Sequence, residues 1–220
     1  MTTMYKENIT CAVCGSQSLH TFLGSTNAFG SQDMDTRPPE MKRSTMDTWV
    51  QECPGCSYCA GDISALLDGA KENIIRPEYQ FMRSDQSIGE LARRFGSSSL
   101  LHEWSDELIQ SGWDSLHAAW DCDDYRNRDK AILFRKRAYS LFSRARASGQ
   151  SIADQAGIDE LLLADICRRA GKMAEAEQLC LIGIDKTNEE FIKKLFAAEI
   201  YWLKAQDSSC HTVEEAGRIR

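Results

Sequence analysis

The chain has 220 residues, of which 42% are hydrophobic, so it is long and apolar enough to bury a core rather than remain disordered. No run approaches the roughly 18 consecutive apolar residues that cross a bilayer, which excludes a membrane-embedded protein. The net charge of −7 is unevenly spread, with four basic and seven acidic side chains in residues 1–62, thirteen of each in 63–149, and nine and thirteen in 150–220.

The first residues of the chain bear on the redox state of its nine cysteines. Met1 to Thr10 contains no apolar stretch that would act as a signal peptide. We therefore expect a cytoplasmic protein with reduced thiols rather than a secreted protein with disulfides. Four of the nine cysteines stand in a pattern typical of a metal site.

That pattern consists of two Cys-x-x-Cys pairs, at residues 11–14 and 53–56. A gap of two residues lets both sulfurs of one tight turn reach a single ion, and a glycine or serine after the second cysteine suits the sharp turn that follows. Four thiolates close the coordination shell, so we expect a structural and not a catalytic ion. The spacing predicts a zinc-ribbon-like β module over residues 1–62, with Zn²⁺ bound by Cys11, Cys14, Cys53 and Cys56.

Two further residues compete for the metal, because Cys59 extends the second pair and His20 lies six residues beyond the first. We interpret Cys59 as a small buried residue on the following strand or helix start, and His20 as an ordinary surface or strand histidine. Residues 1–62 are acidic, and four thiolates around Zn²⁺ add a formal charge of about −2. This balance argues against a module that grips a phosphate backbone.

The segment 24–40 between the pairs is rich in turn formers and predicts an extended, ordered loop. Asp33, Asp35 and Arg37 are its only tight cluster of charges, and two carboxylates beside a guanidinium could bind a cation or an anionic group. The alternative, which we favour, is that they bond to backbone amides and to each other and so hold the loop. Residues 49–51 then predict the strand that leads into the second pair.

From residue 63 onward the spacing of apolar residues is helical, and residues 63–220 are predicted to form an all-α domain. Ser87 and Glu90 resemble a capping box before a helix that Gly96 would end. The other predicted helices cover residues 100–109, 113–122, 130–147, 158–170, 174–184 and 189–205.

The two predicted helices on either side of Gly171 have the spacing of one tetratricopeptide repeat. Small residues at 164, 176 and 183 would let them pack closely, and Cys167 and Cys180 are interpreted as core residues rather than reactive thiols. Residues 113–147 could form a degenerate preceding unit. We therefore predict a tetratricopeptide-like helical domain in the form of a short, capped bundle.

One stretch runs against the acidic balance of the chain, because residues 126–146 carry eight basic side chains and a single acid, Asp129. Such a strip could bind RNA, DNA or an acidic protein. The alternative, which we favour, is that these side chains lay their stems over the core while their charges meet solvent or neighbouring acids. The basic residues are Arg126, Arg128, Lys130, Arg135, Lys136, Arg137, Arg144 and Arg146.

The motifs of common enzymes are missing from the sequence. There is no Gly-x-x-x-x-Gly-Lys-Ser/Thr loop, no Gly-x-Gly-x-x-Gly, no His-Glu-x-x-His and no Gly-x-Ser-x-Gly. His102 and His117 stand isolated on helical patterns and are interpreted as packed or surface histidines. We therefore predict that the protein is not an enzyme.

Several of these features together resemble a known family. They are the first cysteine pair, the Asp-Met-Asp-Thr-Arg-Pro-Pro loop at 33–39, the second pair with Tyr58, and Ala-Ala-Trp at 118–120 before the repeat-like helices. The chain resembles the bacterial family named domain of unknown function 2225, in which a cysteine-rich, zinc-binding part precedes helices. The resemblance covers nearly the whole chain but departs from the family pattern at Ser57 and Cys59, where glycine and alanine are usual. It implies an architecture and no activity.

Three functions follow as hypotheses. The first is a non-enzymatic zinc-binding adaptor that presents a helical groove to a peptide or protein partner, without a membrane. The second is an ion- or ligand-binding protein, or an enzyme, centred on residues 33–37. The third is a nucleic-acid-associated factor that uses the basic strip 126–146. Its candidate contacts are Arg128, Arg135, Lys136, Arg137 and Arg144.

Overall fold

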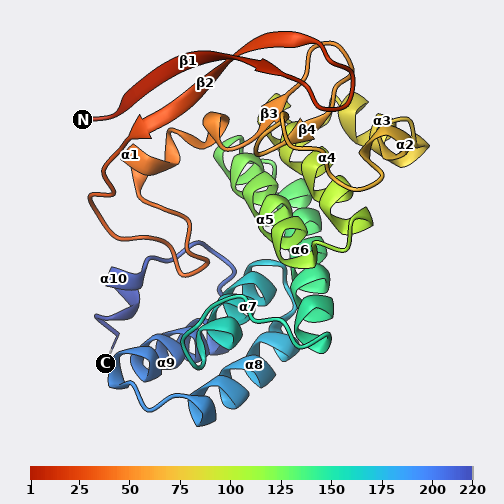
Figure 1. The fold of residues 1–220 in the computed structure, drawn as a ribbon. Coiled ribbons are helices and arrows are strands. Elements are labelled where there is room, and N and C mark those ends of the chain that lie inside the picture. The colour runs from red at the N-terminus through yellow and green to blue at the C-terminus, as the bar shows by residue number, and fades with distance from the viewer. Residues whose placement is uncertain (220) are drawn as a thin grey trace.

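The computed structural model describes residues 1–219, which form a small N-terminal β region followed by helices (Figure 1). β1 (Thr3–Thr10) and β2 (Gln17–Ser25) form a long antiparallel hairpin. A second, very short antiparallel sheet joins β3 (Gln51–Glu52) and β4 (Cys59–Ala60). The predicted N-terminal β region is therefore confirmed, as two separate two-stranded sheets.

Helices dominate the chain after β4. α5 packs against both α4 and α6, and α7, α8 and α9 form a second group at the far end of the molecule from the β1–β2 hairpin (Figure 1). The elements between the strands and after them are α1 (Glu40–Arg43), the 3₁₀ helix η1 (Met46–Thr48), α2 (Ala70–Asn73), α3 (Pro77–Ser84), α4 (Glu90–Trp104), α5 (Leu108–Asp124), α6 (Arg128–Ala147), α7 (Ile158–Arg169), α8 (Met173–Lys186), α9 (Glu190–Lys204) and α10 (Val213–Ala216).

The helices from α6 to α9 are confirmed to within two residues at each end, but two predictions around α4 are wrong. Gly96 does not end a helix: a Cβ there would lie 2.6 Å from the sulfur of Met82, so glycine permits close packing in the middle of α4. Ser87 is not the cap either, because Gly89 precedes the helix without a side-chain bond. Ser87 instead donates its backbone N–H to Asp85 at 2.9 Å.

The boundary between α4 and α5 also differs from the prediction of helices at 100–109 and 113–122. α4 continues to Trp104, and the chain reverses at residues 105–107, where Asp106 has a φ of +61°. The serines that follow Gly96 are typical of loops, yet they are buried where α4 meets α5. Ser99, for example, donates its hydroxyl to the carbonyl of Ser111 at 2.8 Å.

The loop between β2 and α1 crosses the molecule to the C-terminal group of helices (Figure 1). Met34 N donates to His211 O at 2.9 Å, and Val213 N donates to Gln32 O at 2.9 Å. Asp33 and Thr212 thereby form an isolated antiparallel bridge. The loop lies between the β region and α7–α10. Its side chains line two separate cavities, which are described below.

The helical hairpin predicted around Gly171 is present as α7 and α8, and Gly171 has a φ of +75° in the turn. We expect Gly183→Ala in α8 to lower the free energy of unfolding by about 1–3 kcal/mol, since a Cβ would clash with Phe196 Cζ and lie 2.6 Å from Phe196 Cε1 and 2.8 Å from Glu160 Cβ. Urea unfolding measures the change. Gly61→Ala is the matched control, because its Cβ would meet nothing closer than 3.7 Å; an equal loss in both variants would contradict the packing explanation.

Candidate metal centre and arginine-lined pocket

The two Cys-x-x-Cys turns have the same backbone geometry. Cys11 O accepts a hydrogen bond from Gly15 N at 2.9 Å, and Cys53 O accepts one from Ser57 N at 2.8 Å. The residue after each second cysteine is left-handed, with a φ of +75° at Gly15 and +60° at Ser57. The sharp turn predicted after each pair is therefore present, and it favours glycine over serine.

The sulfurs of the four predicted cysteines converge on one point. Cys14 Sγ lies 3.5 Å from Cys53 Sγ, and Cys11 Sγ lies 3.7 Å from Cys56 Sγ. All four lie within 4.8 Å of one another. A tetrahedral ion with metal–sulfur bonds of about 2.3 Å would hold its sulfurs about 3.8 Å apart. The structure thus contains a closed four-cysteine cluster with the dimensions of a metal site.

Neither competing residue belongs to this cluster, which contains the four cysteines and no other described residue. Cys59 is fully buried on β4, where its thiol faces Ser57 O at 3.5 Å. His20 lies on β2 and contacts Ser18 Oγ at 2.7 Å. Cys59 is therefore a buried strand residue and His20 a strand histidine, as the sequence predicted.

The four-cysteine cluster rests on an apolar core that continues into the helices. Tyr79 on α3 donates its hydroxyl to Ser57 O at 2.6 Å and accepts a bond from Cys59 N at 3.1 Å, so α3 clamps the second cysteine turn. The same core contains Cys11, Cys53, Tyr58, Ala60, Ile63, Ala70, Ile74, Tyr79 and Leu101. A bound ion would therefore stabilise the start of the helical region as well as the two turns.

Asp35, one of the three charged residues singled out in the loop, is fully buried and binds side chains from distant helices. Its Oδ2 accepts hydrogen bonds from Trp120 Nε1 at 2.9 Å, Arg135 Nη2 at 3.2 Å and Arg169 Nη1 at 2.6 Å. Burial alone would raise the pKa of this carboxyl, but Arg169 and Arg135 outweigh burial and hold the pKa below its usual value. The favoured interpretation, that the loop charges bond to local backbone amides and to each other, is therefore wrong for most of the contacts of Asp35, since only one is local, from Arg37 N at 3.4 Å.

The other two loop residues lie beside Asp35 but have different surroundings. Arg37 is buried and forms an ion pair with Asp124 at the end of α5. Asp33 lies in the bridge to Thr212, and burial raises the pKa of its carboxyl. The loop therefore brings two of the three charges, on Asp35 and Arg37, into contact with the helices.

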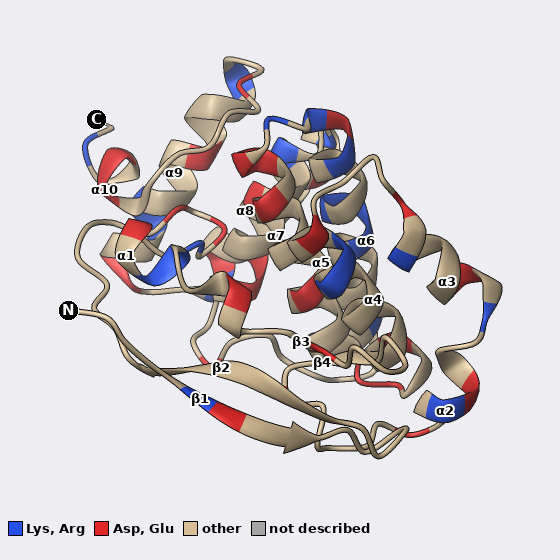
Figure 2. Cartoon of the chain, turned by 90° about the horizontal axis from the view of Figure 1, so that it is seen from above, with Lys and Arg blue, Asp and Glu red and all other residues tan. Residues whose placement is uncertain are grey.

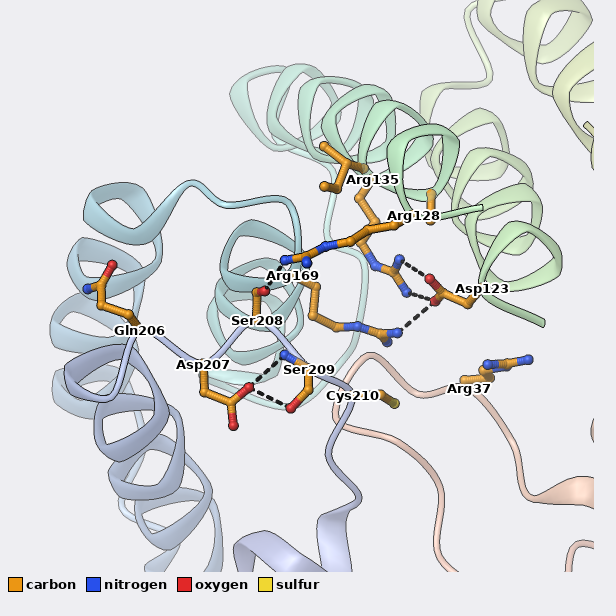
Figure 3. Close-up of a pocket in the computed structure, with 12 residues that line it drawn as sticks. Arg37, Asp123, Arg128, Arg135, Arg169, Gln206, Asp207, Ser208, Ser209 and Cys210 are labelled. Atoms are coloured by element: carbon orange, nitrogen blue, oxygen red, sulfur yellow. Dashed lines mark hydrogen bonds and ion pairs between the residues drawn. The ribbon is translucent and has the colours of Figure 1, made fainter. Parts of the chain in front are cut away.

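A pocket of about 620 Å³ opens where the loop meets the helices (Figure 3). Four guanidinium groups line it, from the loop, α6 and the end of α7, together with the carboxylates of Asp123 and Asp207. Residues 206–210, between α9 and α10, form another wall. The four arginines are Arg37, Arg128, Arg135 and Arg169.

Two of these arginines are held by two aspartates. Asp123 Oδ2 accepts from Arg135 Nη2 at 2.6 Å and from Arg169 Nη2 at 2.7 Å (Figure 3). The same two arginines also bind Asp35. Arg128 reaches across to donate to Ser208 Oγ at 2.8 Å and has no carboxylate partner among the described residues. The Nε atoms of Arg37 and Arg135 are buried without a hydrogen-bond acceptor in residues 1–219. Arg128 is therefore the guanidinium of this pocket whose charge is left to meet an anionic group.

Sequence reasoning missed most of this pocket. Asp123, Arg169 and residues 206–210 carried no motif, although Arg168 and Arg169 stand together in the last turn of α7. Basic residues are common at that position because they complement the helix dipole, so the pair gave no sign of a site.

Most of the basic strip 126–146 is paired within the protein, although Figure 2 shows it as a concentration of basic residues along α6. Arg135 is only 1% exposed and belongs to the pocket network. Arg137 and Arg144 both pair with Glu103 of α4. Further pairs join Lys130 to Asp85 and Arg146 to Glu160. These contacts agree with the favoured interpretation that the strip meets neighbouring acids.

A buried group on α4 and α5 has the residue types of a hydrolytic triad but not its geometry. Asp114 Oδ2 lies 2.9 Å from His102 Nδ1 and accepts from Ser98 Oγ at 2.7 Å. A nucleophile would have to reach Nε2, which instead faces Glu107 at 3.7 Å. His102 is therefore a packed histidine within a network that joins two helices.

Comparison with known proteins adds no assignment, because the chain matches no family model, no curated protein and no solved structure. Within residues 1–219, the helices are all too short or too polar to cross a bilayer.

Proposed function

We propose that this protein is a non-enzymatic, zinc-containing adaptor. In this proposal the metal holds the N-terminal module, and the arginine-lined pocket receives an acidic group of a peptide or protein partner. The observation that carries the proposal is the convergence of four arginines from three segments on one open pocket. Bidentate guanidinium groups are well suited to carboxylate and phosphate recognition.

The choice of zinc rests on the chemistry of the four donors. Thiolates are soft ligands, and a closed tetrahedral set of four cysteines is the usual arrangement of structural zinc. The cluster fits that arrangement in number and spacing. When bound, the ion would cross-link two turns that are separated by 38 residues in the sequence, 15–52. The link would run through the ion, since the four cysteines form no disulfide.

A binding role, rather than catalysis, is supported by the groups around the pocket. Cys210 is the thiol that lines the pocket, and local desolvation together with the nearby carboxylates of Asp33 and Asp35 raises the pKa of this thiol, which keeps it protonated at neutral pH. Among the described residues that line the pocket there is no histidine to act as a base.

Two further parts of the proposal concern context. None of the nine cysteines forms a disulfide, which supports a reducing compartment such as the cytoplasm. We also retain, as a proposal, the resemblance to the bacterial family named domain of unknown function 2225, which rests on the sequence motifs.

We expect Arg128→Gln to weaken binding of an acidic peptide about tenfold, because its guanidinium lacks a carboxylate partner among residues 1–219 and a charge-assisted bond contributes about 1.5–3 kcal/mol before solvent screening. Fluorescence anisotropy with a fluorescein-labelled hexaglutamate peptide would measure the dissociation constant at low and physiological salt. Lys136→Gln is the matched control: it removes the same charge from α6, at an exposed position outside the pocket.

Two results would overturn the proposed pocket function. One is an equal loss of affinity in the Lys136 variant, which would indicate unspecific attraction to the basic face of α6. The other is failure of the hexaglutamate peptide to bind the unaltered protein at low salt.

A further inference from the structure

A second cavity, of about 250 Å³, lies between the loop, the start of α1, Trp49 and α5. It shares no lining residue with the arginine-lined pocket. Asp35 connects the two sites, since it accepts bonds from Trp120 of the second cavity and from Arg135 and Arg169 of the first. The lining residues are Ala28, Gln32, Thr36, Pro38, Pro39, Lys42, Trp49, Trp113, His117 and Trp120.

The walls of this cavity are unusually aromatic. Three of the five tryptophans of the chain line it, together with the imidazole of His117. The His117 ring centre lies 4.9 Å from that of Trp120 and 5.3 Å from that of Trp49. Trp49 and Trp113 are only partly buried, so their rings are not fully used in core packing.

His117 differs from the other three histidines in its hydrogen bonding. His20, His102 and His211 each contact a hydroxyl or a carboxylate. The Nδ1 atom of His117 is buried and has no partner in the described part of the chain. Burial lowers the pKa of His117 to about 4, so this ring is neutral at pH 7. A neutral imidazole without a partner offers one hydrogen bond to an incoming group.

We propose that this cavity binds a flat, neutral aromatic ring of about the size of indole, whose own polar atom bonds to the His117 imidazole. The indole N–H groups of Trp49 and Trp120 are already used, by Thr45 Oγ1 at 3.1 Å and Asp35 Oδ2 at 2.9 Å. These bonds fix the two rings as stacking surfaces. His117 is then the polar group that orients the ligand.

The groups that line the cavity disfavour both a cationic and an anionic ligand. The ring faces of tryptophan attract cations, but the positive charge of Lys42 at the edge repels them, and no carboxylate is among the described lining residues to offset that charge. An anion would face the negative ring faces of the tryptophans. A cavity of about 150 Å³ can hold a benzene ring, so this larger one has room for two fused rings.

The ring could belong to a free heteroaromatic compound or to a tryptophan side chain. Ligand-observed NMR with indole tests the first source, and N-acetyl-tryptophanamide, which carries the same ring on a peptide backbone, tests the second. Binding of either, with transfer of magnetisation from Trp49, Trp113 or Trp120, is expected. Failure of both probes to bind would overturn the proposal without affecting the arginine-lined pocket.

His117→Phe tests the role of the imidazole while keeping an aromatic wall. We expect indole to bind this variant about tenfold more weakly, whereas 1-methylindole, which has no N–H, should bind both proteins alike. If the variant does not fold, the unaltered protein still tests the idea, because indole should bind it about tenfold more tightly than 1-methylindole does. Equal affinities for these two compounds in the unaltered protein would overturn the assignment of His117.

Discussion

Replacing Cys53 with serine is expected to abolish zinc binding and to unfold the N-terminal module. Binding of zinc to four thiolates contributes on the order of 10–16 kcal/mol in small zinc domains, and a set that has lost one sulfur no longer closes around the ion. Elemental analysis of the purified protein should fall from roughly one zinc per chain to none. Hydrogen exchange should also quicken in α3, because Tyr79 bonds to the turn that Cys53 begins.

Cys59→Ser is the control for this experiment, since it removes a nearby buried thiol that lies outside the four-cysteine cluster. It should retain the metal, although burying a hydroxyl in place of a thiol lowers stability somewhat. If the Cys53 variant kept its zinc, or if the Cys59 variant lost it, the ligand assignment would be wrong.

Asp35→Ala should have the largest effect on stability of any single change in the loop, about 3–5 kcal/mol. The reason is that the substitution leaves Arg135 and Arg169 buried without one of their two carboxylates and leaves Trp120 Nε1 without an acceptor. Urea unfolding measures the loss. Asp47→Ala removes an exposed carboxylate from the neighbouring segment and should change stability by less than about 0.5 kcal/mol. If the Asp35 variant and the unaltered protein unfolded at similar urea concentrations, the stabilising role of the Asp35 carboxylate would be contradicted.

The same carboxylate makes stability depend on pH. The pKa of Asp35 is lower in the folded protein than its ordinary value of 3.8, so the folded state binds its proton less readily than the unfolded chain. Its contribution is therefore complete above the unfolded pKa and is lost as the pH falls through the folded pKa. An Asp35→Asn variant should lose less stability between about pH 4 and pH 2 than the unaltered protein does.

The metal site was predictable because its information is local. A Cys-x-x-Cys spacing followed by glycine or serine specifies a turn that both pairs adopt independently, and the ion only has to bring two such turns together. The helices α6 to α9 were predictable for the same reason, since their apolar periodicity runs without interruption. The helix end predicted at Gly96 was wrong, because α4 continues through Gly96 and the serines after it. Close packing against α5 and α6 favours small residues at these positions inside a helix.

The pocket could not be predicted because its contacts are long-range. Asp35 binds partners 85, 100 and 134 residues away, and no pattern around any of these residues marks them as a set. Charge counting indicated that the strip on α6 would meet acids, but not that Arg135 would be buried with Asp35 and Asp123. The aromatic cavity could not be predicted for the same reason. His117 stands isolated in the sequence, and its aromatic neighbours come together around it only when the chain folds.

The pairing of Gln32 and Met34 with residues 211–213 has a consequence for synthesis. These hydrogen bonds join positions about 180 residues apart, so they form only after residues 211–213 have left the ribosome. Until then the loop has no strand to dock against, and the buried faces of Met34 and Trp120 remain open to water and to other nascent chains. Both cavities, whose walls include this loop, are consequently completed only after residues 211–213 have been synthesised.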